Sequence, residues 1–138
     1  TSLGDGLRDK LIRIDPSTNE IVDSVDVGDR ASSVALGDGQ VWVTSQAGRA
    51  LWRVDPRTLE TRETPVEGTP MDVVERNGLA VVASGPFEVA VHRIDAATGA
   101  LLETIPVPGA EGAATAFAEG EEGIWVVGCG FGGGMAAR

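Results

Sequence analysis

The strongest constraint on the fold is an internal repeat with a period of forty residues. Three segments share one pattern and begin at residues 11, 51 and 91: Leu11-Ile-Arg-Ile-Asp-Pro16, Leu51-Trp-Arg-Val-Asp-Pro56 and Val91-His-Arg-Ile-Asp-Ala96. Each is followed by a turn, a second apolar stretch, a glycine-containing loop and a further β-rich run. Self-similarity with this period indicates that copies of one supersecondary unit stack on one another.

The repeated unit has the pattern of a small antiparallel sheet. Its apolar runs are short, rich in Val, Ile, Thr and Trp, and separated by Gly, Asn, Asp and Pro about every ten residues. A four-stranded sheet of this size has two faces to bury and can bury them only against copies of itself. We therefore predict an all-β fold, a β-propeller of four-stranded antiparallel blades with three repeat units per chain. A β-solenoid is the competing stack, but its coils are shorter and its strands are parallel.

We treat residues 1–138 as a single repeat domain. With the strands of a blade labelled A to D from the axis outward, the expected segments are C–D strands at 11–28, a blade at 31–67, a blade at 70–108, A–B strands at 112–128 and a flexible tail at 129–138. Three blades are too few to close a ring. Either a homodimer completes a six-bladed ring with hybrid blades formed in trans, or the chain is part of a longer one.

Composition excludes several classes of partner. The formal net charge is -10, with 21 acidic and 11 basic residues, so we expect no nucleic-acid partner. No apolar run reaches the roughly eighteen residues of a membrane span, so we expect no membrane insertion. Cys129 is the only cysteine, which excludes an internal disulfide and any multi-cysteine zinc site.

Polar residues recur at fixed positions of the repeat. Asp15, Asp55 and Asp95 each precede a turn, where a carboxylate can accept backbone hydrogen bonds, so we interpret them as turn residues. An arginine stands two residues before each aspartate, at Arg13, Arg53 and Arg93. We expect these arginines to form a local ion pair or to contact the neighbouring blade.

No catalytic motif is recognisable. His92, the only histidine, is equivalent to Ile12 and Trp52, so we interpret it as a packing residue without a nucleophile or metal partner. The segment 128–133 has G-x-G-x-x-G spacing but lacks the helix and acidic residue of a dinucleotide site, so we expect a loop. Cys129 within it has no flanking cation. We therefore predict no catalytic residues, no cofactor and no metal site.

The repeated hydrophobic-Arg-hydrophobic-Asp-Pro-x-Thr pattern, the Asp26-Val-Gly28 strand end and the Gly39-Gln-Val-Trp-Val-Thr44 segment together resemble the YVTN-type bacterial β-propeller repeat. The third copy departs from the pattern at His92 and Ala96. The resemblance spans Leu11 to Val127 and implies an extracytoplasmic location, which is periplasmic, secreted or at the cell surface. Related propellers include virginiamycin B lyase and lactonase-type enzymes, but neither catalytic constellation maps onto residues of this chain.

Our first functional hypothesis is a non-catalytic ligand- or protein-binding module of scaffold or sensor type. In a propeller, ligands usually meet the loops that join D to A and B to C. The candidate residues in these loops are Arg30, Arg49, Phe87, Asp29, Gln46, Met71, Glu88 and Glu111. The second hypothesis is a lyase or lactonase-like enzyme with a metal in the channel. The starts of the A strands supply one carboxylate for that metal, Asp72.

Overall fold

The computed structural model describes residues 9–85, 89–107, 114–128 and 136–137, and its regular structure there is entirely β. Antiparallel strands form four sheets within these ranges. The N-terminal pair comprises β1 (Asp9–Asp15) and β2 (Glu20–Val27). The first full sheet comprises β3 (Ala31–Gly37), β4 (Gln40–Ser45), β5 (Ala50–Val54) and β6 (Thr61–Pro65).

The second full sheet repeats this meander. It comprises β7 (Thr69–Arg76), β8 (Leu79–Gly85), β9 (Ala90–Asp95) and β10 (Leu101–Pro106). The C-terminal sheet comprises β11 (Ala114–Gly120), β12 (Gly123–Gly128) and β13 (Ala136–Ala137). The described residues include no helix long and apolar enough to cross a membrane.

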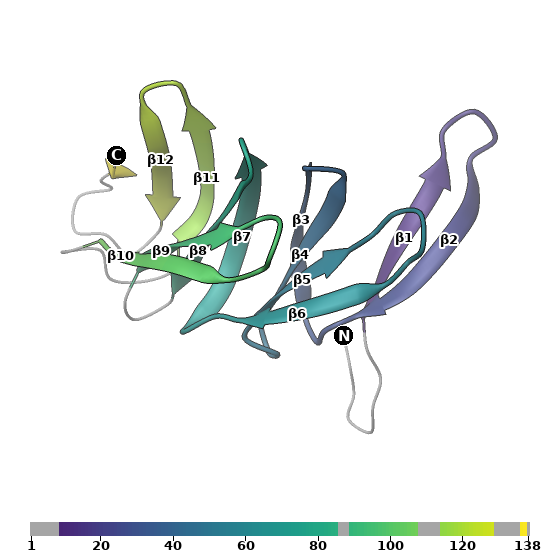
Figure 1. Ribbon diagram of the computed structural model, residues 1–138, viewed down its shortest axis with the longest axis horizontal. Coiled ribbons are helices and arrows are strands. Elements are labelled where there is room, and N and C mark those ends of the chain that lie inside the picture. The colour runs from purple at the N-terminus through teal and green to yellow at the C-terminus, as the bar shows by residue number, and fades with distance from the viewer. Residues whose placement is uncertain (1–8, 86–88, 108–113, 129–135, 138) are drawn as a thin grey trace.

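The four sheets follow one another along an arc (Figure 1). The first strands of successive sheets adjoin, β3 beside β7 and β7 beside β11. The N-terminal pair and the β11–β12 hairpin form the two ends of the arc. The predicted all-β class and antiparallel sheets are thus confirmed, whereas the described sheets form an open arc and not a closed ring.

The turn interpretation of the three aspartates is confirmed. A carboxylate oxygen of each accepts a hydrogen bond from the backbone N–H two residues on, at 2.9 Å for Asp15 and 2.8 Å for both Asp55 and Asp95. In each turn the backbone N–H four residues after the aspartate donates to its carbonyl oxygen. The residue that donates this hydrogen bond has a positive φ angle in each turn: Asn19, Leu59 and Gly99. Identical turns at equivalent positions show that the three copies fold alike.

Each sheet packs on the next through apolar side chains that alternate along its strands. The N-terminal pair contributes Val27 and Leu11 to a cluster with Val43 and Val54 of the first full sheet. The opposite face of the first full sheet contributes Trp42 and its neighbours to a larger cluster with the second full sheet. The members of that larger cluster are Trp42, Leu51, Val66, Val73, Ala80, Val82, Ile94 and Ala96. A full sheet therefore buries apolar side chains on both of its faces.

The two ends of the arc expose side chains that the full sheets bury. Ile14 on β1 is 57% exposed, whereas its repeat equivalents Val54 and Ile94 are 1% and 0% exposed. At the other end Trp125 on β12 is 47% exposed, whereas Trp42 at the equivalent position is 1% exposed. Within the described ranges each end sheet has a neighbouring sheet on one side only, which accounts for this exposure.

Part of the expected flexible tail is instead a strand. Ala136 and Ala137 form β13, which pairs antiparallel with Val127 and Val126 of β12. The expectation was wrong for these two residues because the outer edge of β12 offers unpaired backbone donors and acceptors, which a further strand satisfies. The remainder of the segment, 129–135 and 138, lies outside the described residues.

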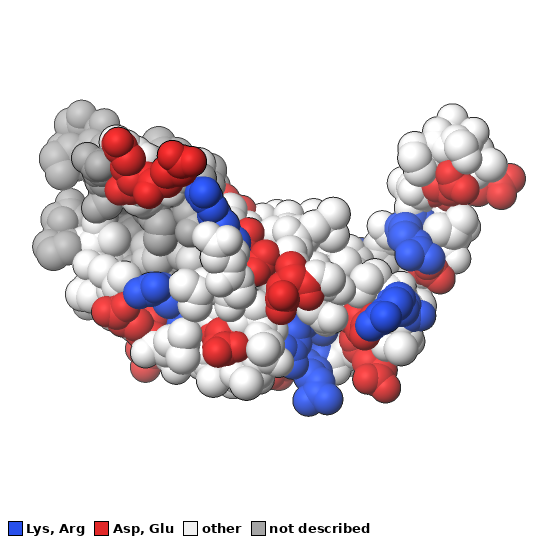
Figure 2. All heavy atoms as spheres, turned by 45° about the horizontal axis from the view of Figure 1, so that its top comes forward, with Lys and Arg blue, Asp and Glu red and all other residues white. Residues whose placement is uncertain are grey.

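Charged side chains of both signs are spread over the surface (Figure 2). Acidic groups gather at the end of the arc formed by β11 and β12, where the turn carries the exposed Glu121 and Glu122. On the N-terminal pair, basic groups lie beside acidic ones, as in the exposed ion pair between Lys10 and Asp26.

Candidate functional site

Backbone hydrogen bonds join the connections between sheets to the β4–β5 turn of the first full sheet. In the β2–β3 connection, the carbonyl oxygens of Arg30 and Asp29 accept from the backbone N–H groups of Gln46 and Ala47, at 3.0 and 3.2 Å. Beyond β6, the backbone N–H of Val66 donates to the carbonyl oxygen of Arg49 at 2.9 Å. This end of the sheets is where the candidate loop residues were expected.

The structure brings four of the predicted site residues together. Asp29 and Arg30 lie in the β2–β3 connection, beside Gln46 of the β4–β5 turn. Nε2 of Gln46 lies 3.6 Å from the sulfur of Met71 on β7. Arg49 is at the far end of the same β4–β5 turn and borders a different pocket. Phe87, Glu88 and Glu111 lie outside the described residues.

Arg30 and Gln46 border a shallow depression of about 630 Å³ beside β1. Its lining residues are all exposed or half-buried: Asp9, Lys10, Ile12, Arg30, Ala31, Ser32 and Gln46. No buried polar side chain lines it in the part of the chain that the structure describes. The depression therefore has charged side chains at its surface, and no buried polar side chain among the described residues.

A second pocket, of about 480 Å³, lies between the two full sheets, and we call it the His92 pocket. Arg49 and Glu67 are exposed on its rim, while Ser84 and His92 are each 1% exposed on its floor. Its lining residues are Arg49, Glu67, Gly68, Thr69, Ser84, Gly85, Val89, Ala90, His92, Thr104 and Pro106. The pocket thus has opposite charges at its rim and buried polar groups inside.

The polar floor of the pocket is a hydrogen-bonded chain across three strands. Ser84 Oγ on β8 lies 2.8 Å from His92 Nε2 on β9. His92 Nδ1 lies 3.1 Å from Thr104 Oγ1 on β10. Both ring nitrogens of the histidine are therefore engaged. The interpretation of His92 as a buried residue is consistent with this geometry, but the premise that no nucleophile type accompanies it was wrong, because Ser84 does.

Burial lowers the pKa of His92 below its usual value, and the nearby Glu67 acts in the opposite direction. The neutral imidazole is the form that burial favours. A neutral imidazole can accept a hydrogen bond from the serine hydroxyl at one nitrogen while it donates to threonine from the other.

The Ser84 and His92 pairing was recoverable from the repeat. Val82 pairs with His92 and Ser84 pairs with Ala90, so Ser84 and His92 are diagonal neighbours on one face of the β8–β9 hairpin. The signal was the replacement of Trp52 by His92 in a repeat that keeps the serine, as Ser45 and then Ser84.

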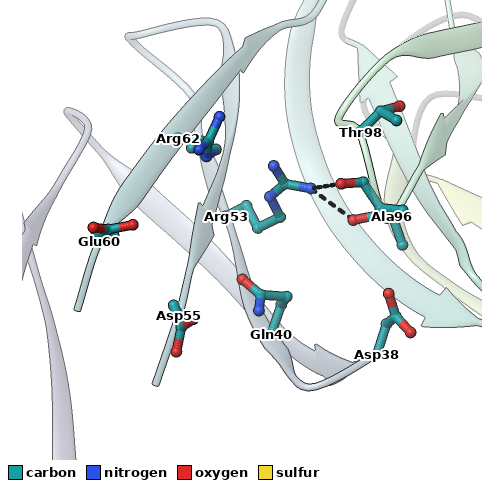
Figure 3. Close-up of a pocket in the computed structure, with 9 residues that line it drawn as sticks. Asp38, Gln40, Arg53, Asp55, Glu60, Arg62, Ala96 and Thr98 are labelled. Atoms are coloured by element: carbon teal, nitrogen blue, oxygen red, sulfur yellow. Dashed lines mark hydrogen bonds between the residues drawn. The ribbon is translucent and has the colours of Figure 1, made fainter. Parts of the chain in front are cut away.

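The three repeated arginines use both of the expected interactions. Arg13 forms an ion pair with Asp23, and Arg93 forms one with Glu103 at 3.1 Å. Arg53 instead crosses to the neighbouring sheet, where its Nη1 donates to the carbonyl oxygens of Ala96 and Ala97 at 2.7 and 2.8 Å (Figure 3). Its guanidinium also lies 5.9 Å from the ring centroid of Trp42.

Arg53 occupies one side of a polar groove of about 410 Å³, drawn in Figure 3. The groove is lined by Asp38, Gln40, Arg53, Asp55, Glu60, Arg62, Ala96, Ala97 and Thr98. The Asp55 carboxylate accepts a hydrogen bond within its own turn, and the Arg53 guanidinium donates to two carbonyl oxygens. We therefore assign this groove a structural role in joining the two full sheets.

The carboxylate of Asp72, which the second hypothesis assigns to a channel metal, links β7 to β3. Its Oδ1 accepts from Ser33 Oγ on β3 at 2.5 Å and from the backbone N–H of Val73 at 2.9 Å. Among the described residues no cluster of three His, Cys, Asp or Glu side chains could hold a metal ion. Cys129 and the glycine-rich segment after Gly128 lie outside those residues.

Comparison with protein-family models finds no match, and comparison with curated protein sequences finds none either. Solved structures do resemble the chain. Hydrazine synthase of Kuenenia stuttgartiensis aligns with a TM-score of 0.78 and 16% identity, over 86% of this chain and 35% of that chain. A luciferin-regenerating enzyme aligns with a TM-score of 0.64 and 17% identity, over 89% of this chain and 45% of that chain.

Both neighbours have propeller-like folds, and this chain spans less than half the length of either. At these identities the likeness concerns the fold alone. The chain is therefore an all-β protein of antiparallel sheets with propeller-like structural neighbours.

Removal of the Arg53 bridge should weaken the contact between the full sheets. We expect Arg53→Leu to lower the free energy of unfolding by about 1–3 kcal/mol, because two carbonyl oxygens lose a charged donor. Urea denaturation measures the change. Arg57→Ala is the control, since the Arg57 side chain is 88% exposed. A loss below about 0.5 kcal/mol for Arg53→Leu would contradict the assignment.

The lowered pKa of His92 predicts a pH dependence of stability. The unfolded chain binds a proton on His92 more readily than the folded chain does. The full contribution of neutral His92 to the free energy of unfolding is therefore present at pH values above the pKa of the unfolded state, about 6.5. It is lost as the pH falls from there toward the lower pKa of the folded state. Urea denaturation at about pH 7.5 and about pH 5.5 should show a larger loss for the wild type than for His92→Gln. Equal losses would count against this prediction.

Proposed function

We propose that this chain is a ligand-binding module that takes a small polar molecule in the His92 pocket. The observation that carries the proposal is a pair of oppositely charged side chains, Arg49 and Glu67, on the rim of a pocket with a buried polar floor. No ion pair joins these two side chains within the described residues.

The lining suggests how the ligand is held. The guanidinium of Arg49 suits a carboxylate, which it can bind with two parallel hydrogen bonds. The carboxylate of Glu67 suits an ammonium or hydroxyl group. Ser84 and Thr104 offer hydroxyl groups farther in, and Val89 and Pro106 offer apolar contact. A volume of about 480 Å³ suits a small molecule.

Ligand binding can be tested with small carboxylates. In a thermal-shift screen of monocarboxylates, dicarboxylates and amino acids, we expect at least one compound to raise the melting temperature, and titration calorimetry then measures its affinity. Arg49→Ala should weaken binding at least tenfold, because a charged hydrogen-bond pair is worth about 1.5–3 kcal/mol. Arg57→Ala, at an exposed turn away from the pocket, should bind as the wild type does. No shift with any compound, or equal affinity in Arg49→Ala, would contradict the proposal.

We also infer that the arc is part of a closed propeller of the YVTN type with an extracytoplasmic location. The repeated sequence pattern supports the family and the location, and the exposed end faces support the ring. Ile12 and Ile14 on the N-terminal pair are exposed at positions where a full sheet meets its neighbour. A second copy of the chain can cover them, as can further blades of a longer chain.

Light scattering distinguishes these two completions. We expect the wild-type chain to have twice the monomer mass and Ile14→Glu to have the monomer mass, because the substitution places a charge in an apolar contact. Leu102→Glu is the control, since Leu102 is exposed on the outer strand of a full sheet. A monomeric wild type would contradict completion by a second copy. A hybrid blade would also require β1 of the partner copy to displace β13 from β12.

A further inference from the structure

The side chains on the floor of the His92 pocket have the arrangement of a nucleophile, a base and an orienting group. Ser84 Oγ is 2.8 Å from His92 Nε2, which is within hydrogen-bond reach for proton transfer. Thr104 Oγ1 is 3.1 Å from the other ring nitrogen, Nδ1. In the tautomer with the proton on Nδ1, threonine accepts that proton's hydrogen bond and Nε2 is free to accept from serine. This is the general geometry of an activated hydroxyl.

The first full sheet provides an internal comparison for this arrangement. Its equivalent serine, Ser45, donates from Oγ to the carbonyl oxygen of Asp29 at 2.7 Å and accepts from the backbone N–H of Gly48 at 3.2 Å. The neighbouring side chain there is Trp52, whose ring nitrogen is a donor and cannot act as a base. The serine of the first full sheet is thus satisfied by backbone groups.

Ser84 is bonded differently. Apart from the contact with His92, its Oγ forms one hydrogen bond within the described residues, which it donates to the carbonyl oxygen of Ala90 at 3.5 Å. That distance is at the limit of a hydrogen bond. The change from Trp52 to His92 between the two repeats therefore places a side chain that can act as a base beside the serine hydroxyl, where the first full sheet has an indole.

Glycines line the pocket next to the serine hydroxyl. A Cβ atom added to Gly68, whose φ is 82°, would lie 3.4 Å from Ser84 Oγ and 3.4 Å from the carbonyl oxygen of Gly85. Gly68 and Gly85 both line the His92 pocket. Gly68 thus lies close against the Ser84 hydroxyl, where any side chain would touch it.

We propose that Ser84 is the nucleophile of an acyl-transfer site in the His92 pocket, with His92 as its base and small, negatively charged carboxylic esters as its substrates. The inference goes beyond the proposed binding function and uses the same pocket. Thr104 is a positioning residue, since it acts only through the imidazole. Arg49 is the one cation among the described lining residues and would hold the negative charge of the ester.

The reaction balances with water as the second substrate. Ser84 Oγ bonds to the carbonyl carbon as its proton moves to His92 Nε2. The bond from that carbon to the leaving oxygen then breaks, and the alcohol departs with the proton from Nε2. Water attacks the acyl-serine, gives a proton to Nε2 and releases the acid as Ser84 Oγ takes that proton back. A base must be neutral to begin this cycle, and burial of His92 favours the neutral form.

A fluorophosphonate probe tests the nucleophile directly. With this probe an Oγ–P bond forms, the P–F bond breaks, fluoride leaves and the serine proton passes to His92. We expect a single adduct on the peptide that contains Ser84, and none in Ser84→Ala. His92→Gln should react about 100-fold more slowly, as is typical for loss of a general base. Ser45→Ala, at the equivalent position of the first full sheet, is the matched control and should react as the wild type does.

The role of Thr104 needs a measurement that a purely structural residue would not change. We expect Thr104→Val to shift the midpoint of the pH profile of labelling, because Nδ1 loses its hydrogen-bond acceptor while Arg49 and Glu67, the charged groups lining the pocket, are unchanged. A lower rate with an unmoved midpoint would overturn that role.

The outcomes separate this proposal from the binding function. No adduct in the folded wild-type chain, or an adduct that persists in Ser84→Ala, overturns the nucleophile, whatever the result of the carboxylate titrations. Labelling confined to Ser84 supports it even if no carboxylate in the panel binds. Thermal melts by circular dichroism show whether each variant is folded. Should Ser84→Ala fail to fold, the position of the adduct in the wild type decides the question by peptide mass spectrometry.

Discussion

The structure depends on the burial of two apolar faces by sheets that are only four strands wide. Each full sheet meets this requirement through its neighbours, with one cluster around Val43 and Val54 and a larger one around Trp42 and Ile94. The same requirement explains the exposed Ile14 and Trp125 at the ends of the arc, where a neighbour is missing. Hydrophobic contact between sheets therefore explains both which side chains are buried inside the arc and which are exposed at its ends.

Polar contacts between sheets add specificity to this apolar packing. Arg53 reaches two carbonyl oxygens in the next sheet, and Ser33 reaches Asp72 across the inner strands. Arg13 and Arg93 occupy the same position of the repeat as Arg53 yet form ion pairs. The interaction that each arginine forms depends on the residue opposite it on the adjacent strand. Asp23 and Glu103 supply carboxylates for Arg13 and Arg93, whereas Arg62 stands opposite Arg53.

The His92 pocket arises where one copy of the repeat differs from the others. In the first full sheet, Ser45 at the end of the second strand is held by backbone hydrogen bonds, and Trp52 on the third strand packs into an apolar cluster. With histidine in place of tryptophan, the same backbone holds a base against a hydroxyl. A repeat fold can thus acquire a candidate reactive site through one substitution, without a change in its sheets.

The amino-acid sequence alone determined the period, the strands and the turns, because these follow from local patterns: alternating apolar residues, and aspartates that bind their own turns. It also located Arg49 at a loop that borders the pocket. Only the tertiary structure decided that Ser84 and Thr104 flank His92, that Arg53 crosses to another sheet, and that Ala136 and Ala137 pair with β12. These outcomes depend on strand register and on the packing of one sheet against the next, which join residues that no local pattern relates.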